Sequence, residues 1–283
     1  MKNILIPTDF SDTSKDAFLY AQSFVKQAAN FRVLHSFYPS LELEYPYLDQ
    51  TPDDFYKARK KQVKTFATAN LTASGERILL DTVVSPIVNI GLAGDVIIKE
   101  SQGDTDLLVM GRTGSNSVFE KVFGTVSTHV AQHAHCPVLL VPKDTTFKSI
   151  KKVLFATNKR VFSEERMIEK LVNTLEGHRP EIHFVQVHND IFNYSNLESE
   201  EHELLDLFKK IAPNLVVKIT KLRSDYALES IFEYANKESI DLITLVTEHR
   251  NTLQQLFHRS MTKRMILKSQ TPLLVMHYEA SKE

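Results

Sequence analysis

Short apolar runs alternate with longer segments of helical periodicity along the whole chain. The apolar runs lie at about 3–8, 31–37, 82–90, 106–110 and 138–142, and again at about 152–157, 181–187, 215–222, 241–246 and 272–276. Such alternation is typical of βαβ units with parallel strands. The pattern predicts an α/β fold of two tandem doubly wound domains, each a Rossmann-like unit with a five-stranded parallel sheet.

Capping residues mark where several of the intervening helices begin. The helix after the first strand is expected to begin at a Ser11 or Thr13 cap. Thr51 and Pro52 supply a cap and a first-position proline for the next helix. Further helices are expected at about 92–102, from the glycine-rich loop to near His135, and at 164–175 and 198–212.

An internal repeat accounts for the two sets of strands. The segment 2–9 reappears in pattern as 151–158, and the segment 106–110 reappears as 241–245. The two segments lie closer together in the second copy than in the first, so the second copy is shorter in its middle. We expect domains at 1–145 and 149–279, joined by a polar stretch.

Composition and charge exclude several classes of protein. The net charge is −1, and the chain up to Pro142 has 13 basic and 15 acidic residues against 21 and 20 beyond it, so neither half predicts a nucleic-acid surface. No apolar run approaches the roughly 20 residues of a membrane span. Met1 leads straight into a strand-like run without a signal peptide, and Cys136 is the only cysteine. These features favour a cytoplasmic protein with no membrane partner.

Glycine is scarce and unevenly placed. The chain has 8 glycines, where average usage near 7% predicts about 20. Seven of them precede residue 143, and only Gly177 follows. The loops of the two copies therefore differ in their chemistry.

Three of these glycines form the most informative motif, between the fourth strand and the following helix. Gly111 and Gly114 are followed after nine residues by Gly124, Thr125, Val126 and Ser127. Glycines let backbone approach a ligand closely, and the first turn of a helix offers free N–H groups and a positive dipole end to phosphate. The motif predicts a nucleotide cradle, and the alternative is that the glycines only shape a tight loop.

The spacing G-x2-G-x9-G-[ST], with Asp9 ending the first strand, resembles the universal stress protein family, and the repeat resembles its two-domain members. The resemblance implies that ATP or a related adenine nucleotide (ADP or AMP), with or without Mg²⁺, binds in the first domain. It also implies a regulatory role in the stress response, without catalysis, and a homodimer or an intramolecular pseudo-dimer of the two domains.

Carried over by position, the nucleotide-binding residues would form three groups. Asp9 would face the ribose, and the backbone of Ser36 would meet adenine. The residues along the ribose and phosphates would be Met110, Gly111, Thr113, Gly114, Gly124, Thr125, Val126 and Ser127. Arg112 and Lys121 are further candidates for phosphate contact from the loop.

The second copy departs from this pattern, which predicts that it does not bind ATP in the same way. The positions equivalent to the three glycines and to Asp9 hold Val246, His249, Arg259 and Asn158. Glu248, at the Thr113 position, would repel a phosphate. Only Ser260, at the Thr125 position, keeps a hydroxyl side chain. The basic residues His249, Arg250 and Arg259 either form a site for a different anion or are solvated residues of a polar loop.

Two other functions remain as alternatives, and one histidine cluster has a spacing that needs to be weighed as a metal site. The first alternative is an interaction protein that binds no nucleotide and acts as a dimer. The second is a slow ATPase, although the sequence offers no general base for hydrolysis. His129 and His133 have the i,i+4 spacing that zinc uses, with His135 and Cys136 nearby. No HExxH glutamate accompanies them, so we expect no metal site there.

Overall fold

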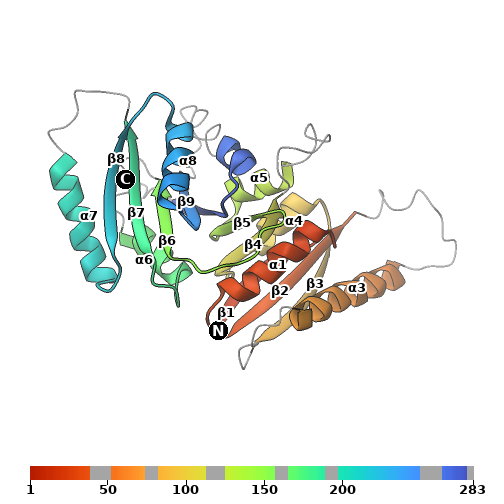
Figure 1. Ribbon diagram of the computed structural model, residues 1–283. Helices are drawn as coiled ribbons and strands as arrows, with labels where there is room; N and C mark the ends of the chain where they lie inside the picture. The colour runs from red at the N-terminus through yellow and green to blue at the C-terminus, as the bar shows by residue number, and fades with distance from the viewer. Residues whose placement is uncertain are drawn as a thin grey trace, which may run out of the picture. The chain divides into compact units, whose positions relative to one another are not determined.

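The computed structural model describes residues 1–38, 52–73, 82–112, 125–156, 165–188, 197–248 and 263–278. The chain forms two compact units, Met1–Phe147 and Lys148–Glu283. Each unit alternates strands and helices along the chain (Figure 1). The predicted α/β class is confirmed.

Unit 1 has a five-stranded parallel sheet in the order β3-β2-β1-β4-β5. Its strands are β1 Lys2–Pro7, β2 Ala29–Phe37, β3 Val83–Ile90, β4 Leu107–Arg112 and β5 Val138–Pro142. Ile4, Leu5 and Ile6 of β1 are fully buried. Helices cover both faces of the sheet, which is why its central strands are continuous apolar runs rather than alternating ones.

The helices of unit 1 lie in two layers (Figure 1). One layer holds α1 Asp12–Phe24 and α3 Pro52–Ala73, which contact each other, and the second holds α4 Ala93–Glu100 and α5 Thr125–His133. Of the two predicted caps for α1, Ser11 is the one used, because its side chain accepts a hydrogen bond from the backbone N of Ser14. The helix α1 of the first layer therefore begins a few residues beyond the carboxyl end of β1.

Unit 2 repeats this plan with the strand order β10-β9-β6-β7-β8, again all parallel. Its strands are β6 Lys152–Ala156, β7 Glu181–His188, β8 Val217–Arg223, β9 Leu242–Glu248 and β10 Leu273–Tyr278. Its helices include α6 Glu165–Thr174, α7 Leu197–Ile211 and α8 Ala227–Glu238. The bounds of α6 and α7 closely match the segments that the sequence predicts.

Strand register relates the two units position by position. Ile4 pairs with Leu107 in unit 1, and Val153 pairs with Leu242 in unit 2, so the pairing joins the same positions that the sequence repeat treats as equivalent. The register also extends the equivalence to the second strands, because Ile4 pairs with Phe31 and Val153 with Ile182. Equivalent positions are thus identified without an alignment.

Two strand ends differ from the sequence-based ranges. β4 continues beyond the expected 106–110 through Gly111 and Arg112, because both residues still pair with β5. β2 begins at Ala29, before the expected range 31–37, because Ala29 pairs with Lys2 of β1, and Ser36 lies inside the expected range, paired with Asn89 of β3. Hydrogen-bonded neighbours extend these strands, and the sequence of a single strand does not reveal its neighbours.

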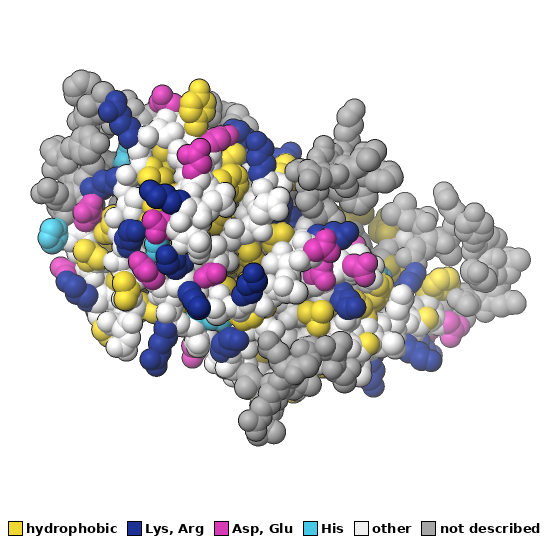
Figure 2. Space-filling view, in the orientation of Figure 1, with side chains coloured by type: hydrophobic (Ala, Val, Ile, Leu, Met, Phe, Trp, Pro, Cys, Tyr) yellow, Lys and Arg dark blue, Asp and Glu magenta, His cyan; other side chains and the backbone are white. Residues whose placement is uncertain are grey.

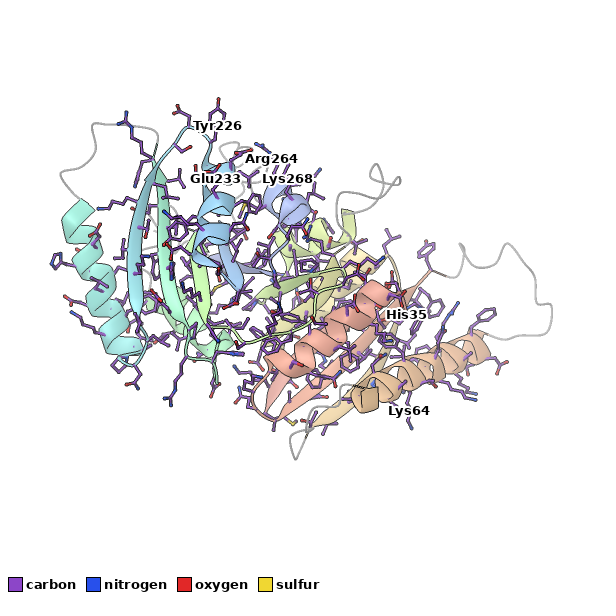
Figure 3. All side chains as sticks on the ribbon, viewed as in Figure 1. His35, Lys64, Tyr226, Glu233, Arg264 and Lys268 are labelled. Atoms are coloured by element: carbon purple, nitrogen blue, oxygen red, sulfur yellow. The ribbon has the colours of Figure 1, made fainter. Side chains whose placement is uncertain are left out.

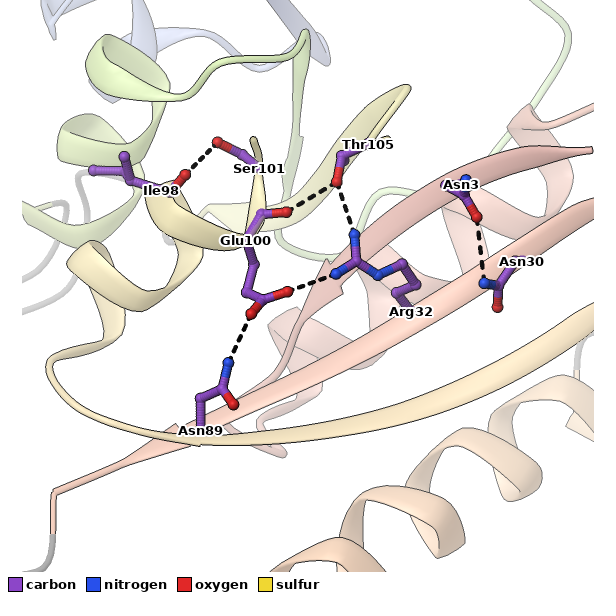
Figure 4. Close-up of polar contacts among 8 residues, drawn as sticks. All are labelled: Asn3, Asn30, Arg32, Asn89, Ile98, Glu100, Ser101 and Thr105. Carbon is purple, nitrogen blue, oxygen red and sulfur yellow. Dashed lines mark hydrogen bonds and ion pairs between the residues drawn. The ribbon is translucent and has the colours of Figure 1, made fainter. Parts of the chain in front are cut away.

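A polar network joins β2, β3 and α4 in unit 1 (Figure 4). Arg32 donates to Glu100 Oε2 at 2.5 Å and to Thr105 Oγ1 at 2.9 Å. Asn89 donates to the other carboxylate oxygen of Glu100 at 2.8 Å. The Arg32 and Glu100 side chains are only 21% and 22% exposed. The ion pair is therefore partly shielded from water, and each carboxylate oxygen of Glu100 accepts a hydrogen bond.

Replacing Glu100 with alanine is expected to destabilise unit 1 by about 2 kcal/mol, because a largely buried arginine loses its counter-charge. Urea unfolding monitored by circular dichroism measures the change. Lys209→Ala is the control, since its ion pair with Asp206 is exposed, and its expected cost is below about 0.5 kcal/mol. Equal losses in the two variants would contradict the prediction.

Unit 2 has a buried histidine among its strands. His183 of β7 is 0% exposed, its Nδ1 lies 2.8 Å from the Tyr234 hydroxyl, and its Nε2 lies 3.3 Å from a Glu181 oxygen. Burial lowers the pKa of His183 below its usual 6.5, although the charge of Glu181 acts in the opposite direction. The folded state therefore favours the neutral ring.

This depressed pKa predicts a loss of stability in acid. Because the unfolded chain takes up a proton on His183 more readily than the folded one, its contribution to stability is present above pH 6.5 and decreases as the pH falls below that value. Urea unfolding is measured about one pH unit above and about one pH unit below 6.5. The free energy of unfolding should decrease more between these two pH values in the wild type than in His183→Asn. A loss as large in the variant would assign the effect to other groups.

Candidate functional site

The candidate site lies at the carboxyl ends of β1 and β4, which are neighbours in the sheet. From β1 the chain continues toward β2 and β3, and from β4 it continues toward β5 on the opposite side. The strand order therefore reverses between β1 and β4. Such a switch point is where open α/β sheets bind ligands.

Asp9 lies in the turn between β1 and α1. It is exposed, and its Oδ1 accepts hydrogen bonds from the backbone N and the Oγ of Ser11, at 3.1 and 2.5 Å. Its Oδ2 accepts none from the described residues. One oxygen of the carboxylate therefore fixes the side chain, while the other is available to a ligand hydroxyl.

The next residue, Phe10, has a φ of +66°, a left-handed conformation that is uncommon for residues other than glycine. Its N donates to Thr8 Oγ1 at 2.9 Å, and its ring lies 4.5 Å from the His35 ring and 5.7 Å from Phe66, measured between centroids. The turn that presents Asp9 is therefore held by contacts on both sides.

The ends of β2 and β3 add an apolar rim to this edge of the sheet. Ser36 lies near the end of β2, and the N of Gly91 donates to the carbonyl of Phe37 at 2.9 Å, which keeps the two strand ends together. The rim consists of Tyr38, Ile90 and Leu92, which are 45%, 62% and 60% exposed. Large exposed apolar side chains at a strand edge are able to cover a planar ring. The sequence reasoning missed this rim, because exposure is not visible in a hydrophobic pattern.

Gly111 is required by packing within unit 1. A Cβ on this residue would lie 2.4 Å from the backbone O of Thr13 and 2.6 Å from its Cγ2. The first turn of α1 therefore occupies the space that the sequence reasoning assigned to a ligand. Contact between the Gly111 backbone and a nucleotide remains a prediction.

The other predicted phosphate residues are partly described. Met110 is 7% exposed, Val126 is 39% exposed and Ser127 is 7% exposed. Thr125 is the first residue of α5. Thr113, Gly114 and Gly124 lie outside the described residues, as does Lys121. The structure thus describes both sides of the glycine motif: the end of β4 and the beginning of α5.

Arg112 differs from the expectation of a cation in the loop. It is a residue of β4, paired with Pro142, and it is 2% exposed. Burial lowers the pKa of Arg112 to about 10. Its side chain is therefore enclosed by protein at the end of a strand rather than placed in a loop, and contact between Arg112 and a phosphate remains a prediction.

In unit 2 the equivalent strand end is β9. Val246 has the register position of Gly111, so a branched side chain stands where unit 1 has none. Glu248 is the last residue of β9. Asn158, His249, Arg250, Arg259 and Ser260 lie outside the described residues. A close approach of the kind between Gly111 and Thr13 is excluded by the Val246 side chain.

The histidines of α5 have ordinary contacts within the protein. His133 Nδ1 lies 2.8 Å from the carbonyl O of His129, and His129 Nε2 lies 3.5 Å from a carboxylate oxygen of Asp95. In the described parts of the chain, no three His, Cys, Asp or Glu side chains are grouped as metal ligands are.

On the face that Figure 2 shows, basic and acidic side chains are interspersed. Within the described ranges, no helix combines the length and the apolar character that crossing a membrane requires.

The strand order, the switch point and the two-unit repeat define a tandem Rossmann-like α/β protein. The chain belongs to the universal stress protein family, whose family model matches residues 1–142. It is 24% identical over 294 residues to universal stress protein Slr1230 of Synechocystis, covering 97% of this chain and 99% of that protein. It is 26% identical over 155 residues to universal stress protein MJ0577 of Methanocaldococcus jannaschii, covering 50% and 95%.

A solved universal stress protein from Archaeoglobus fulgidus has the same fold over the full chain. Its TM-score is 0.71 at 18% identity, covering 99% of this chain and 97% of that one. The predicted family, its two-domain form and the fold class are therefore confirmed.

Proposed function

We propose that unit 1 binds ATP or a related adenine nucleotide and that binding regulates the protein's shape or its choice of partner in a stress response. The observation that carries this proposal is the Asp9 carboxylate at the β1–β4 switch point, held through Oδ1 with Oδ2 unused by the described residues. A fixed acceptor at this place suits the hydroxyls of a ribose.

The rim formed by Tyr38, Ile90 and Leu92 supports the assignment of the base. It flanks Ser36, whose backbone would meet adenine. Burying these side chains against a planar base removes apolar surface from water. The nucleoside would thus lie across the ends of β1, β2 and β3.

The phosphates would extend toward α5. Its first residues, Thr125, Val126 and Ser127, have backbone N–H groups without partners inside the helix, and the helix dipole favours negative charge there. Met110, Gly111, Thr113, Gly114 and Gly124 would line the path between ribose and phosphates. Mg²⁺, if carried by the nucleotide, would neutralise part of the phosphate charge.

Unit 2 is proposed not to bind the nucleotide in this way. Val246 replaces Gly111, and the sequence places Arg259 and Asn158 at the positions of Gly124 and Asp9. The second unit would be structural, and the chain would assemble as a homodimer or use its two units as an intramolecular pair. No general base is assigned to the site, so hydrolysis would be slow or absent.

The test is calorimetric titration of the full chain with ATP, ADP and AMP, with and without Mg²⁺. Gly124→Arg, which introduces the residue of the second copy, is expected to abolish binding. Gln102→Arg is the control for the added charge. Gln102 is exposed and lies between α4 and β4, at the amino ends of the strands, whereas the proposed site lies at their carboxyl ends. Equal binding by the wild type and Gly124→Arg would reject the assigned cradle.

A wild type that binds no nucleotide would favour the alternative of a dimeric interaction protein. Release of phosphate over many turnovers, lost in Asp9→Ala, would favour an ATPase. Gel filtration with and without ATP measures the proposed change in shape or assembly.

A further inference from the structure

The turn between β1 and α1 holds an unfavourable backbone conformation, and its geometry determines where Asp9 points. Phe10 adopts a φ of +66°, although it carries a large side chain. Such conformations persist only where the surroundings impose them. One of the constraints is local, because Thr8 Oγ1 accepts from the N of Phe10 and also lies 2.9 Å from Ser14 Oγ.

A second constraint comes from His35 of β2, far away in the sequence (Figure 3). Its Nδ1 lies 2.9 Å from the carbonyl O of Thr8. Its ring also lies against Phe10, with centroids 4.5 Å apart and planes tilted by 38°. One side chain therefore contacts the turn both immediately before and immediately after Asp9.

The partner of His35 determines which nitrogen carries the hydrogen. A carbonyl oxygen only accepts, so Nδ1 must be the donor. His35 Nε2 is buried and has no hydrogen-bond partner among the described residues. With Nδ1 bound to hydrogen and facing the carbonyl, the ring donates its one hydrogen bond among the described residues to the Thr8 backbone.

We propose that His35 is a positioning residue of the nucleotide site, which holds the turn that presents Asp9 to the nucleoside. The proposal rests on the proposed function of unit 1 and adds a residue that touches no ligand itself. The same register position in unit 2 is Gln186, which lies 3.3 Å from His188. The second copy thus has neither the histidine nor the aspartate at the equivalent positions, which hold Gln186 and Asn158.

Two substitutions separate the hydrogen bond from the bulk of the ring. His35→Leu removes the donor and keeps an apolar side chain, whereas His35→Asn places an amide donor close to the position of Nδ1. We expect His35→Leu to weaken ATP binding about tenfold and His35→Asn to restore most of the affinity, since one hydrogen bond has about that effect. Gln186→Leu, the matched control in unit 2, should bind ATP as the wild type does.

Inorganic tripolyphosphate distinguishes positioning from general damage. It lacks the nucleoside that Asp9 would bind, so its affinity should be equal in the wild type and in His35→Leu. Equal loss of affinity for ATP and for tripolyphosphate, or an unchanged affinity for ATP, would overturn the proposal. Thermal unfolding of each variant confirms that folded protein is being compared.

Two measurements need no nucleotide. The ring ¹⁵N shifts of His35 should show the tautomer with hydrogen on Nδ1, and the amide of Phe10 should exchange about tenfold faster in His35→Leu, because its turn opens more often. The opposite tautomer or an unchanged exchange rate would overturn the role of His35. A wild type that binds no ATP would instead reject the proposed function, and exchange alone would then decide whether His35 holds the turn.

Discussion

Gly111→Ala is expected to destabilise unit 1 by about 3 kcal/mol, the upper part of the usual range for overpacking. The added Cβ would lie 2.4 Å from the backbone O and 2.8 Å from the backbone C of Thr13. These atoms belong to the first turn of α1, so relief requires a shift of a helix rather than a rotation of a side chain. Real Cβ atoms do not approach backbone so closely, and the strain would spread to the turn of Asp9.

The measurement is urea unfolding of the full chain, with signals assigned to each unit. Gly103→Asn is the control, because Gly103 has open space around it and a φ of +72°, which asparagine tolerates better than most residues. Its expected cost is below about 1 kcal/mol. A mild effect of Gly111→Ala, comparable to that of the control, would show that α1 is free to move away from β4.

Asp9→Ala is expected to weaken ATP binding by about 10- to 100-fold, because a hydrogen bond to a charged group contributes about 1.5–3 kcal/mol. Asp9→Asn should fall between alanine and the wild type. Its amide oxygen still accepts from Ser11, which preserves the turn, but it bears no charge toward a ribose hydroxyl. Asparagine is also the residue of the second copy, at position 158.

Competition between ATP and its analogues identifies the contact. 2′-Deoxy- and 3′-deoxy-ATP should bind the wild type less tightly than ATP, and the difference should vanish for one of them in Asp9→Ala. If Asp9→Ala lost affinity for every analogue and for tripolyphosphate to the same degree, the carboxylate would act on the phosphates or on folding instead.

Periodicity was sufficient for the elements of both units, because buried parallel strands and amphipathic helices leave local signals. The strand ranges agree closely with the observed bounds, and Ser11 and Pro52 marked helix starts where they were expected. The repeat was also visible, since the positions that it treats as equivalent recur in the pairing of β1 with β4 and of β6 with β9.

Contacts between distant segments were not visible in the same way. Arg112 looked like a loop cation, because nothing in its neighbouring residues shows that β5 pairs with it and that protein encloses its side chain. No role was predicted for His35 from the sequence, because β2 holds several polar residues and nothing local distinguishes this one. Its partners Thr8 and Phe10 lie far from it along the chain.

The sequence by itself determined the α/β class, the two copies and the glycine spacing that distinguishes them. Those features depend on periodicity and on residue identity, which are local. Only the tertiary structure decided that Gly111 makes room for Thr13 and that the Asp9 turn rests on His35. The physical reason is that a close approach or a hydrogen bond between strands and helices depends on which elements become neighbours, and that is fixed only when the sheet is assembled.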